Sequence, residues 1–217
     1  MKLGYPCINI SIGCTANSTF RLYNYSEDNM KAKIENNLNC LKKILKFNVE
    51  KGLLFFRISS DLVPFASHPV CKFNWKNEFK DEFIKIGNFI KKNNMRISMH
   101  PDQFVVINSL KEDVVKRSTD ELVYHCDALD TMELDNTAKV QIHVGGVYGD
   151  KKKSIKRFID NYSRMPLKVK KRLVVENDEK SYSLKDCLLI SEKIKIPVIF
   201  DSFHHSCLNH GENIKES

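Results

Sequence analysis

The sequence predicts an α/β protein of the TIM-type (β/α) barrel class, and three observations lead to this prediction. Short apolar runs alternate with longer amphipathic segments throughout the 217 residues, an order typical of βαβ units and a parallel sheet. No stretch rich in Pro, Gly or Ser divides the chain, so we expect a single domain over residues 1–217. Polar residues of metal-binding type follow several of the apolar runs, which is where barrel enzymes place their sites.

The predicted strands are apolar runs of the length that buried strands have. A doubly wound sheet is complete with six strands, whereas an eight-stranded barrel typically takes about 250 residues, so the count alone leaves both folds open. The positions of the polar residues favour the barrel, with about six βα units present. In chain order the strands are Leu3–Ile10, Leu53–Ile58, Arg96–Met99, Lys139–Val144, Arg172–Val175 and Pro197–Phe200.

The predicted helices carry apolar residues at helical spacing on one face. Asp28–Lys46 places Ile34, Leu38, Leu41 and Leu45 on such a face, and Glu78–Lys92 does the same with Phe79, Phe83, Ile86 and Ile90. The remaining helices are expected at Glu112–Met132, Ser154–Ser163 and Leu184–Ile194.

Composition indicates a cytoplasmic protein with a polyanionic partner. The net charge of +8 favours nucleic acid, because neutralised phosphates release their counterions. The seven cysteines are odd in number and form no C-x-x-C pair, which fits reduced, mostly buried thiols better than disulfides or a zinc knuckle. We expect no signal peptide and no membrane partner, since no run approaches about 18 apolar residues. Nothing indicates an obligate protein partner.

Metal-ligand residue types stand at the ends of four consecutive predicted strands: His100, His143, Glu176 and Asp201. The carboxyl ends of barrel strands converge on one rim, so these side chains are expected to share a cavity. Imidazole and carboxylate together suit zinc, manganese or iron, and a carboxylate can bridge two ions. Singly, each residue would be read as a cap or turn residue. His205 is either a ligand or a partner of one, and residues 177 and 178 could be turn residues.

Five segments resemble the motifs of the UV damage endonucleases, which are relatives of endonuclease IV in the xylose-isomerase-like barrel group. They occur in the family's order and cover nearly the whole chain. They are Arg57–Ser60, Ser98–Phe104, Ile142–Lys151, Glu176–Asp178 and Phe200–His204.

The resemblance implies a DNA-repair endonuclease that cuts double-stranded DNA 5′ to UV photoproducts and related lesions. Its cofactor would be a cluster of up to three divalent ions, most often Mn²⁺, with Zn²⁺, Co²⁺ or Mg²⁺ as alternatives. His100, His143 and Glu176 match the ligands of one ion and are the expected catalytic residues. Glu176 would bridge to a second ion shared with Asp201, and His204 would bind the third.

The resemblance also implies residues that recognise the lesion. Gln103 and Phe104 stand where the family has a Gln-Tyr pair that wedges into the duplex, although Phe104 could instead be a core aromatic. Tyr5 and Asn9 match positions beside the lesion pocket, with core packing as the alternative for Tyr5.

Two further residues have an implied role near the site. His68 matches a histidine that the family keeps there as a metal ligand, and packing within its loop is the alternative. Lys151, which opens a run of three lysines, would contact phosphates or simply begin a solvated helix.

The chain departs from the family after the sixth strand. Later histidine and glutamate ligands have no counterpart, so we expect the C-terminal barrel units to be missing or supplied by a second chain. The site is then expected to hold one metal well and a second poorly. Two other functions stay open: a metal-dependent sugar isomerase or hydrolase of the same barrel group, and a catalytically impaired fragment that binds damaged DNA.

Overall fold

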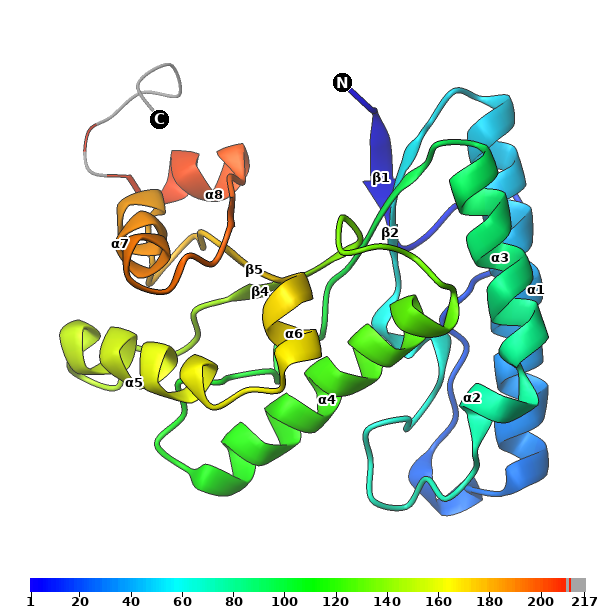
Figure 1. The fold of residues 1–217 in the computed structure, drawn as a ribbon, viewed down its shortest axis with the longest axis horizontal. Coiled ribbons are helices and arrows are strands. Elements are labelled where there is room, and N and C mark those ends of the chain that lie inside the picture. Colours follow the sequence, from blue (N-terminus) through cyan, green and yellow to red (C-terminus); the bar gives the residue numbers. More distant parts are fainter. Residues whose placement is uncertain (210, 212–217) are drawn as a thin grey trace. The chain divides into compact units, whose positions relative to one another are not determined.

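The structure is a computed structural model that describes residues 1–209 and 211 and divides into two compact units. The first unit comprises Met1–His100 and Tyr124–Lys139, and the second comprises Pro101–Val123 and Val140–Ser217. Each unit is built from parallel strands that alternate with helices along the chain (Figure 1).

The first unit contains strands β1 (Gly4–Pro6), β2 (Phe55–Ile58) and β3 (Arg96–Met99), paired in parallel in that order. Helices α1 (Glu27–Glu50) and α3 (Lys80–Lys92) contact each other and run side by side (Figure 1). The shorter elements are the 3-10 turns η1 (Leu22–Asn24) and η2 (Ser60–Leu62) and the helix α2 (Trp75–Glu78).

The long helix α1 begins and packs as its sequence predicts. Ser26 is its N-cap and accepts a hydrogen bond from the backbone of Asn29, while Glu27 and Asp28 place negative charge at the positive end of the helix dipole. The predicted apolar face is buried along its whole length. In α3 the residues Phe83, Ile86 and Ile90 are buried, but Phe79 is half-buried and joins α2 to α3.

The first predicted strand was too long. β1 ends at Pro6 because Cys7 adopts a left-handed conformation with φ of 59°, and Ile8 and Ile10 beyond it are exposed. The sixth strand is also shorter than predicted: β6 comprises only Val198–Ile199.

The second unit contains β4 (Lys139–His143) except for its first residue, together with β5 (Leu173–Glu176) and β6, again parallel and in chain order. Helix α4 (Glu112–Thr131) begins in this unit and ends in the first. Helix α7 (Leu184–Ile194) contacts β5, β6 and α5 (Lys151–Ser163). Two short helices were not predicted, α6 (Leu167–Arg172) and α8 (Ser202–Cys207).

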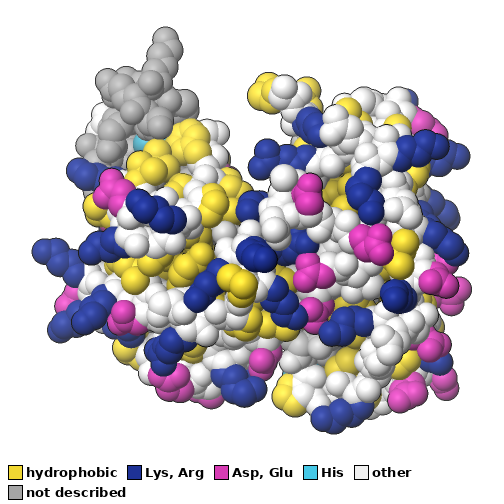
Figure 2. All heavy atoms as spheres, viewed as in Figure 1, with side chains coloured by type: hydrophobic (Ala, Val, Ile, Leu, Met, Phe, Trp, Pro, Cys, Tyr) yellow, Lys and Arg dark blue, Asp and Glu magenta, His cyan; other side chains and the backbone are white. Residues whose placement is uncertain are grey.

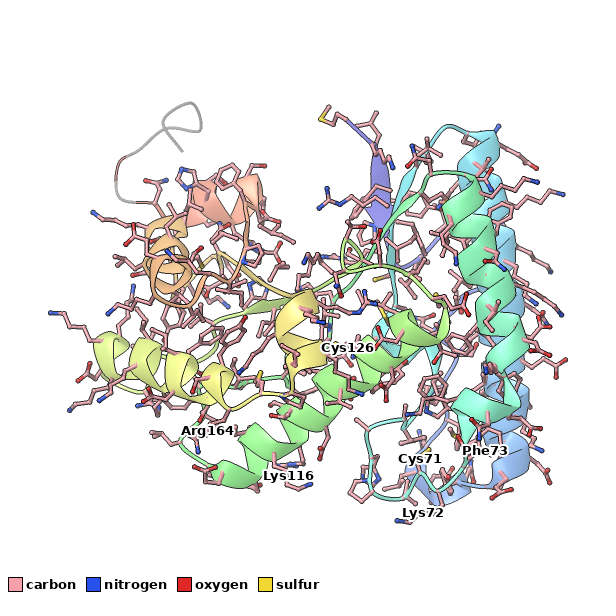
Figure 3. The ribbon with its side chains drawn as sticks, in the orientation of Figure 1. Cys71, Lys72, Phe73, Lys116, Cys126 and Arg164 are labelled. Carbon is pink, nitrogen blue, oxygen red and sulfur yellow. A yellow bond between two sulfur atoms is a disulfide. The ribbon has the colours of Figure 1, made fainter. Side chains whose placement is uncertain are left out.

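The cysteines depart from the prediction of reduced, mostly buried thiols. Cys14 and Cys40 form a disulfide that ties the segment after β1 to helix α1, and Cys207 is exposed. Their separation of 26 residues gives no local signal, because the loop folds back along α1. Cys126 is buried as expected, whereas Cys71 is half-buried in the loop before α2 (Figure 3).

Basic and acidic side chains are mixed over the face of the molecule in Figure 2, with hydrophobic side chains gathered over α7 and α8. The exposed apolar residues of these helices are Leu188, Leu189 and Phe203. Within the described residues, no helix is both long enough and apolar enough to cross a membrane.

Candidate metal centre

A group of potential metal ligands lies at the carboxyl ends of the strands in the second unit. Glu176 ends β5, Asp201 is the N-cap of α8, and His204 lies in the first turn of that helix. One ligand atom from each of the three lies within 4.8 Å of the others. Two carboxylates and an imidazole form a donor set suited to a divalent transition-metal ion.

His143 joins this group from the neighbouring strand. It is the last residue of β4 and lies opposite Glu176 in the parallel register. Its Nε2 atom is 3.8 Å from Glu176 Oε2, and its ring centroid is 5.3 Å from that of His204. The second unit therefore brings together four of the predicted ligands, which lie at the ends of β4 and β5 and just beyond the end of β6.

The Glu176 carboxylate is held by a residue that sequence reasoning missed. Only 4% of Glu176 is exposed, and its Oε2 accepts a hydrogen bond of 3.1 Å from Gln141 Nε2. Gln141 precedes His143 by two residues on β4, so strand alternation places both side chains on the same face. That period-two spacing is the signal that could have identified it.

Asp201 and His204 are linked through the start of α8. Asp201 is the N-cap of this helix, and its Oδ1 accepts a hydrogen bond of 2.8 Å from the backbone N–H of His204. The Nδ1 atom of His204 lies 2.8 Å from the carbonyl oxygen of Asn177. A carbonyl oxygen only accepts, so Nδ1 carries a proton, and in the neutral ring the lone pair is then on Nε2.

His204 Nε2 lies near a carboxylate that the sequence did not single out. Glu179 Oε2 lies 3.8 Å from His204 Nε2. The pKa of Glu179 is held below its usual value, first by the N–H of its own backbone and then by nearby positive charge, from His204 when its ring is protonated, from Lys180, and from His143 when protonated. Glu179 is thus an additional acidic group at the edge of the cluster, with its carboxylate favoured in the charged form.

The two residues after Glu176 have different roles. Asp178 is a turn residue, as one alternative predicted, because its carboxylate accepts hydrogen bonds from the backbones of Lys180, Ser181 and Tyr182. Asn177 is fully buried and bonds to distant residues instead.

The other predicted histidines differ in burial and in their surroundings. His100 is half-buried directly after β3 and His68 is exposed, both in the first unit. The Nδ1 of His68 accepts the backbone N–H of Val70 at 3.1 Å, a contact within its own loop. His205 is buried, with its ring 5.3 Å from that of Phe200. Metal binding by His100 and His68 remains a prediction.

Two of the lesion-binding candidates lie on the surface. Gln103 and Phe104 are both exposed in the loop after β3, and Phe104 is 77% exposed. The alternative that Phe104 is a core aromatic is therefore wrong; Val105 and Ile107 of the same apolar run are buried instead.

Tyr5 and Asn9 lie close to each other in the first unit. The Tyr5 ring packs edge-on against Phe56 at 5.4 Å. Its hydroxyl donates to Asn48 Oδ1 and accepts from Asn9 Nδ2, each at 2.5 Å. Tyr5 therefore makes the packing contacts that the alternative, a role in core packing, predicts. Its role beside a lesion remains a prediction.

Lys151 is the first residue of α5 and is engaged within the second unit. Its ammonium lies 2.9 Å from Asp186 Oδ2 and 5.6 Å from the centre of the Tyr182 ring. The exposed cations at this helix start are Lys152 and Lys153. Contact between Lys151 and phosphate remains a prediction.

Parallel βα units with polar side chains gathered at the carboxyl ends of successive strands are typical of the (β/α)-barrel class of enzymes. A comparison of the whole sequence with known families agrees with this class and narrows it. The chain belongs to the UV-endonuclease UvdE family, whose family model matches residues 1–217.

The curated and solved relatives support this assignment. The chain is 44% identical over 213 residues to the UV DNA damage endonuclease of Clostridium perfringens. The matched region covers 98% of this chain and 51% of the relative. The chain spans about half the length of the curated relatives it matches. The crystal structure of SacUVDE superposes with a TM-score of 0.96 at 50% identity, covering 99% of this chain and 73% of that one.

A more distant solved structure bears on the fold alone. Endonuclease IV from Thermus thermophilus has a TM-score of 0.56 at 13% identity, covering 77% of this chain and 60% of that one. Together the matches confirm the predicted family resemblance and the predicted barrel class.

Proposed function

We propose that this protein is a DNA-repair endonuclease that hydrolyses the phosphodiester bond 5′ to UV photoproducts and related lesions in double-stranded DNA. The observation that carries the proposal is the convergence of His143, Glu176, Asp201 and His204 at the carboxyl ends of β4, β5 and β6. The name of the curated relatives, UV DNA damage endonuclease, supplies the reaction class.

The proposed cofactor is a divalent metal ion, with Mn²⁺ as first choice and Zn²⁺, Co²⁺ or Mg²⁺ as alternatives. The donor set fits such an ion, since the His204 tautomer leaves Nε2 available and Glu176 and Asp201 supply oxygen atoms. We assign His100, His143 and Glu176 as catalytic ligands, with Asp201 and His204 at further ions and His68 as an additional ligand. When bound, the metal supplies Lewis-acid stabilisation of charge on the phosphate.

The protein's own residues would select and hold the damaged duplex. Phe104 projects from the loop after β3 with an exposed ring that could replace the stacking lost at a distorted base step, with Gln103 beside it. Tyr5 and Asn9 are assigned to the lesion pocket and Lys151 to the phosphates. The net charge of +8 favours this polyanionic substrate.

We further propose that both units belong to one barrel domain and that the protein acts in the cytoplasm without an obligate protein partner. The sugar isomerase or hydrolase of the same barrel group is the competing function, and salt-sensitive binding to duplex DNA would argue against it.

The proposal is tested with a duplex that carries one cyclobutane pyrimidine dimer. The chain is incubated with this duplex and Mn²⁺, beside an EDTA control, the His143→Ala variant and the same duplex without damage. We expect a nick immediately 5′ to the dimer that requires Mn²⁺ and His143. Binding without a nick, with about one ion per chain, would indicate the impaired damage-binding protein. Neither binding nor cleavage of the damaged duplex would refute the proposal.

A further inference from the structure

Asn177 connects the end of β5 to the segment that carries two of the candidate ligands. It follows Glu176 directly and is fully buried. Its Oδ1 accepts the backbone N–H of Asp201 at 2.8 Å, and its Nδ2 donates to the Asp201 carbonyl oxygen at 3.0 Å. The amide therefore pairs with both backbone polar groups of Asp201.

The two hydrogen bonds between the Asn177 amide and the Asp201 backbone lie just beyond the last paired residues of β5 and β6. β6 contains only Val198–Ile199, and the register ends with Glu176 opposite Ile199. Two strand residues provide little to fix the chain beyond them, yet Asp201 must be held with its carboxylate near Glu176. The Asn177 amide supplies two more hydrogen bonds at that point, as a further step of the ladder would.

The backbone of Asn177 acts on the next ligand. Its carbonyl oxygen accepts the Nδ1–H of His204 at 2.8 Å, which leaves the Nε2 lone pair for a metal ion. Since Asp201 also caps the backbone of His204 at 2.8 Å, the positions of the two ligands are coupled. One residue therefore holds the backbone of one ligand and selects the tautomer of the other.

A purely local turn role does not account for these contacts. The neighbouring Asp178 has that role and bonds to residues 180–182. The bonds of Asn177 instead span 24 and 27 residues of sequence, and each ends on a candidate metal ligand.

We propose that Asn177 is a positioning residue, which presets Asp201 and His204 for metal binding before the ion arrives. This inference rests on the metal centre of the proposed function. The positioning requires both Oδ1 and Nδ2 of the Asn177 amide, because the Asp201 backbone presents one donor and one acceptor. Asn177→Asp keeps the shape but places a carboxylate oxygen against the Asp201 carbonyl oxygen, where a hydrogen bond is lost and lone pairs repel.

The test begins with the metal-free protein labelled with ¹⁵N-histidine, whose long-range ¹H–¹⁵N spectrum distinguishes the two neutral tautomers at pH 8. The His204 signals are assigned by comparison with His204→Gln. In the wild-type protein we expect the form protonated at Nδ1. In Asn177→Asp and Asn177→Ala we expect a mixture of tautomers, because the segment can move away from the Asn177 carbonyl.

Mn²⁺ affinity is measured on the same samples, and Asn161→Asp is the matched control. Asn161 is also a buried asparagine of the second unit, and its Nδ2 donates to the Ile107 carbonyl at 2.6 Å, a contact with no candidate ligand. Loss of one partner of a metal ligand typically weakens binding 10–100-fold, so we expect a weakening of about tenfold or more in both Asn177 variants. Asn161→Asp should leave the His204 tautomer and the Mn²⁺ affinity unchanged.

Each outcome decides between the inference and the function on which it rests. Wild-type His204 protonated at Nε2 would overturn the inference without any variant. A folded Asn177→Asp that keeps the wild-type tautomer and Mn²⁺ affinity would also overturn it, while leaving the proposed metal centre intact. A wild-type protein that binds no Mn²⁺, Zn²⁺, Co²⁺ or Mg²⁺ would instead refute the metal centre, and the inference with it.

Discussion

Gln141 donates a hydrogen bond from Nε2 to Oε2 of Glu176 at 3.1 Å, and both residues are almost fully buried. The contact joins two adjacent strands, because Gln141 is on β4 and Glu176 ends β5. A buried carboxylate needs such donors, since leaving it unpaired costs free energy. Gln141 therefore orients the oxygen that also faces His143.

Gln141→Leu is expected to weaken Mn²⁺ binding about tenfold, at the lower end of what loss of an outer partner typically costs. The substitution removes the donor but keeps a buried side chain of similar size. Isothermal titration with Mn²⁺ measures the change. The control is Ile142→Leu, a nearly isosteric change at the next residue of β4, which points to the opposite face. Equal affinities of Gln141→Leu and Ile142→Leu would contradict the prediction.

Phe104→Ala is expected to reduce the preference for damaged over undamaged duplex by about tenfold, because stacking on an aromatic side chain is worth about 1–3 kcal/mol. Competition binding of the two duplexes at fixed salt measures it. The ring is 77% exposed, so stability and Mn²⁺ affinity should not change. Phe104→Tyr should keep the preference.

Leu110→Ala is the matched control for Phe104. Leu110 belongs to the same connection between β3 and α4 and is 63% exposed, but its side chain has no aromatic face. A similar loss of preference in both variants would show that Phe104 contributes apolar surface alone, and unchanged preference in Phe104→Ala would rule out the wedge.

The sequence predicted helix α7 more accurately than strand β1. Helix α7 was predicted at its observed bounds from its apolar spacing, and its ends carry local signals: the N-cap Ser183 forms a capping box with Asp186, and Lys195 ends the helix in a left-handed conformation. β1 was overpredicted because Ile8 and Ile10 are apolar yet exposed. An apolar run forms a strand only where an adjacent strand pairs with it, and the local sequence does not show whether such a partner strand is present.

The sequence predicted which candidate ligands would lie close together, but not the residues that hold them in place. The rule that barrel strands end at the site singled out His143, Glu176 and Asp201, because each stands at the end of an apolar run of the sequence. The contacts of Gln141 and Asn177 depend on strand register and on bonds that span 24 to 35 residues. The Cys14–Cys40 disulfide was missed for the same reason, since its partners meet only in the folded chain.

Gly145→Ala is expected to destabilise the loop that follows His143 by about 2–4 kcal/mol. Gly145 has a φ of 108°, and an added Cβ would lie 2.4 Å from Oδ1 of the fully buried Asn108. Asn108 cannot easily move, because its Nδ2 donates to the Gly146 carbonyl at 2.8 Å. Urea unfolding measures the free-energy change.

Gly149→Ala separates the steric part of that cost from the conformational part. Gly149 also has a positive φ, 77°, but an added Cβ would meet nothing within 4 Å. It should therefore cost only about 1–2 kcal/mol for the left-handed conformation. Equal destabilisation by the two substitutions would refute the role assigned to the Asn108 contact.

Cys187 is expected to resist alkylation in the folded protein. Burial, followed by the negative charges of Asp178, Asp186 and Glu176, raises the pKa of its thiol to about 12. The reactive thiolate is therefore scarce at pH 8, and the side chain is also inaccessible. The folded pKa exceeds the ordinary thiol value of 9.0, so unfolding releases a proton above that pH and the free energy of unfolding should fall as pH rises past 9.

Iodoacetamide labelling at pH 8, followed by peptide mass spectrometry, measures this difference within one sample. Cys207, the exposed last residue of α8, is the internal control and should be modified first, while Cys187 should react only after urea is added. Because Cys187 is a buried residue of α7, and α7 contacts β5 and β6, its protection reports on the packing of this helix. Labelling of Cys187 in the native protein at the rate of Cys207 would mean that α7 is not packed against those strands in solution.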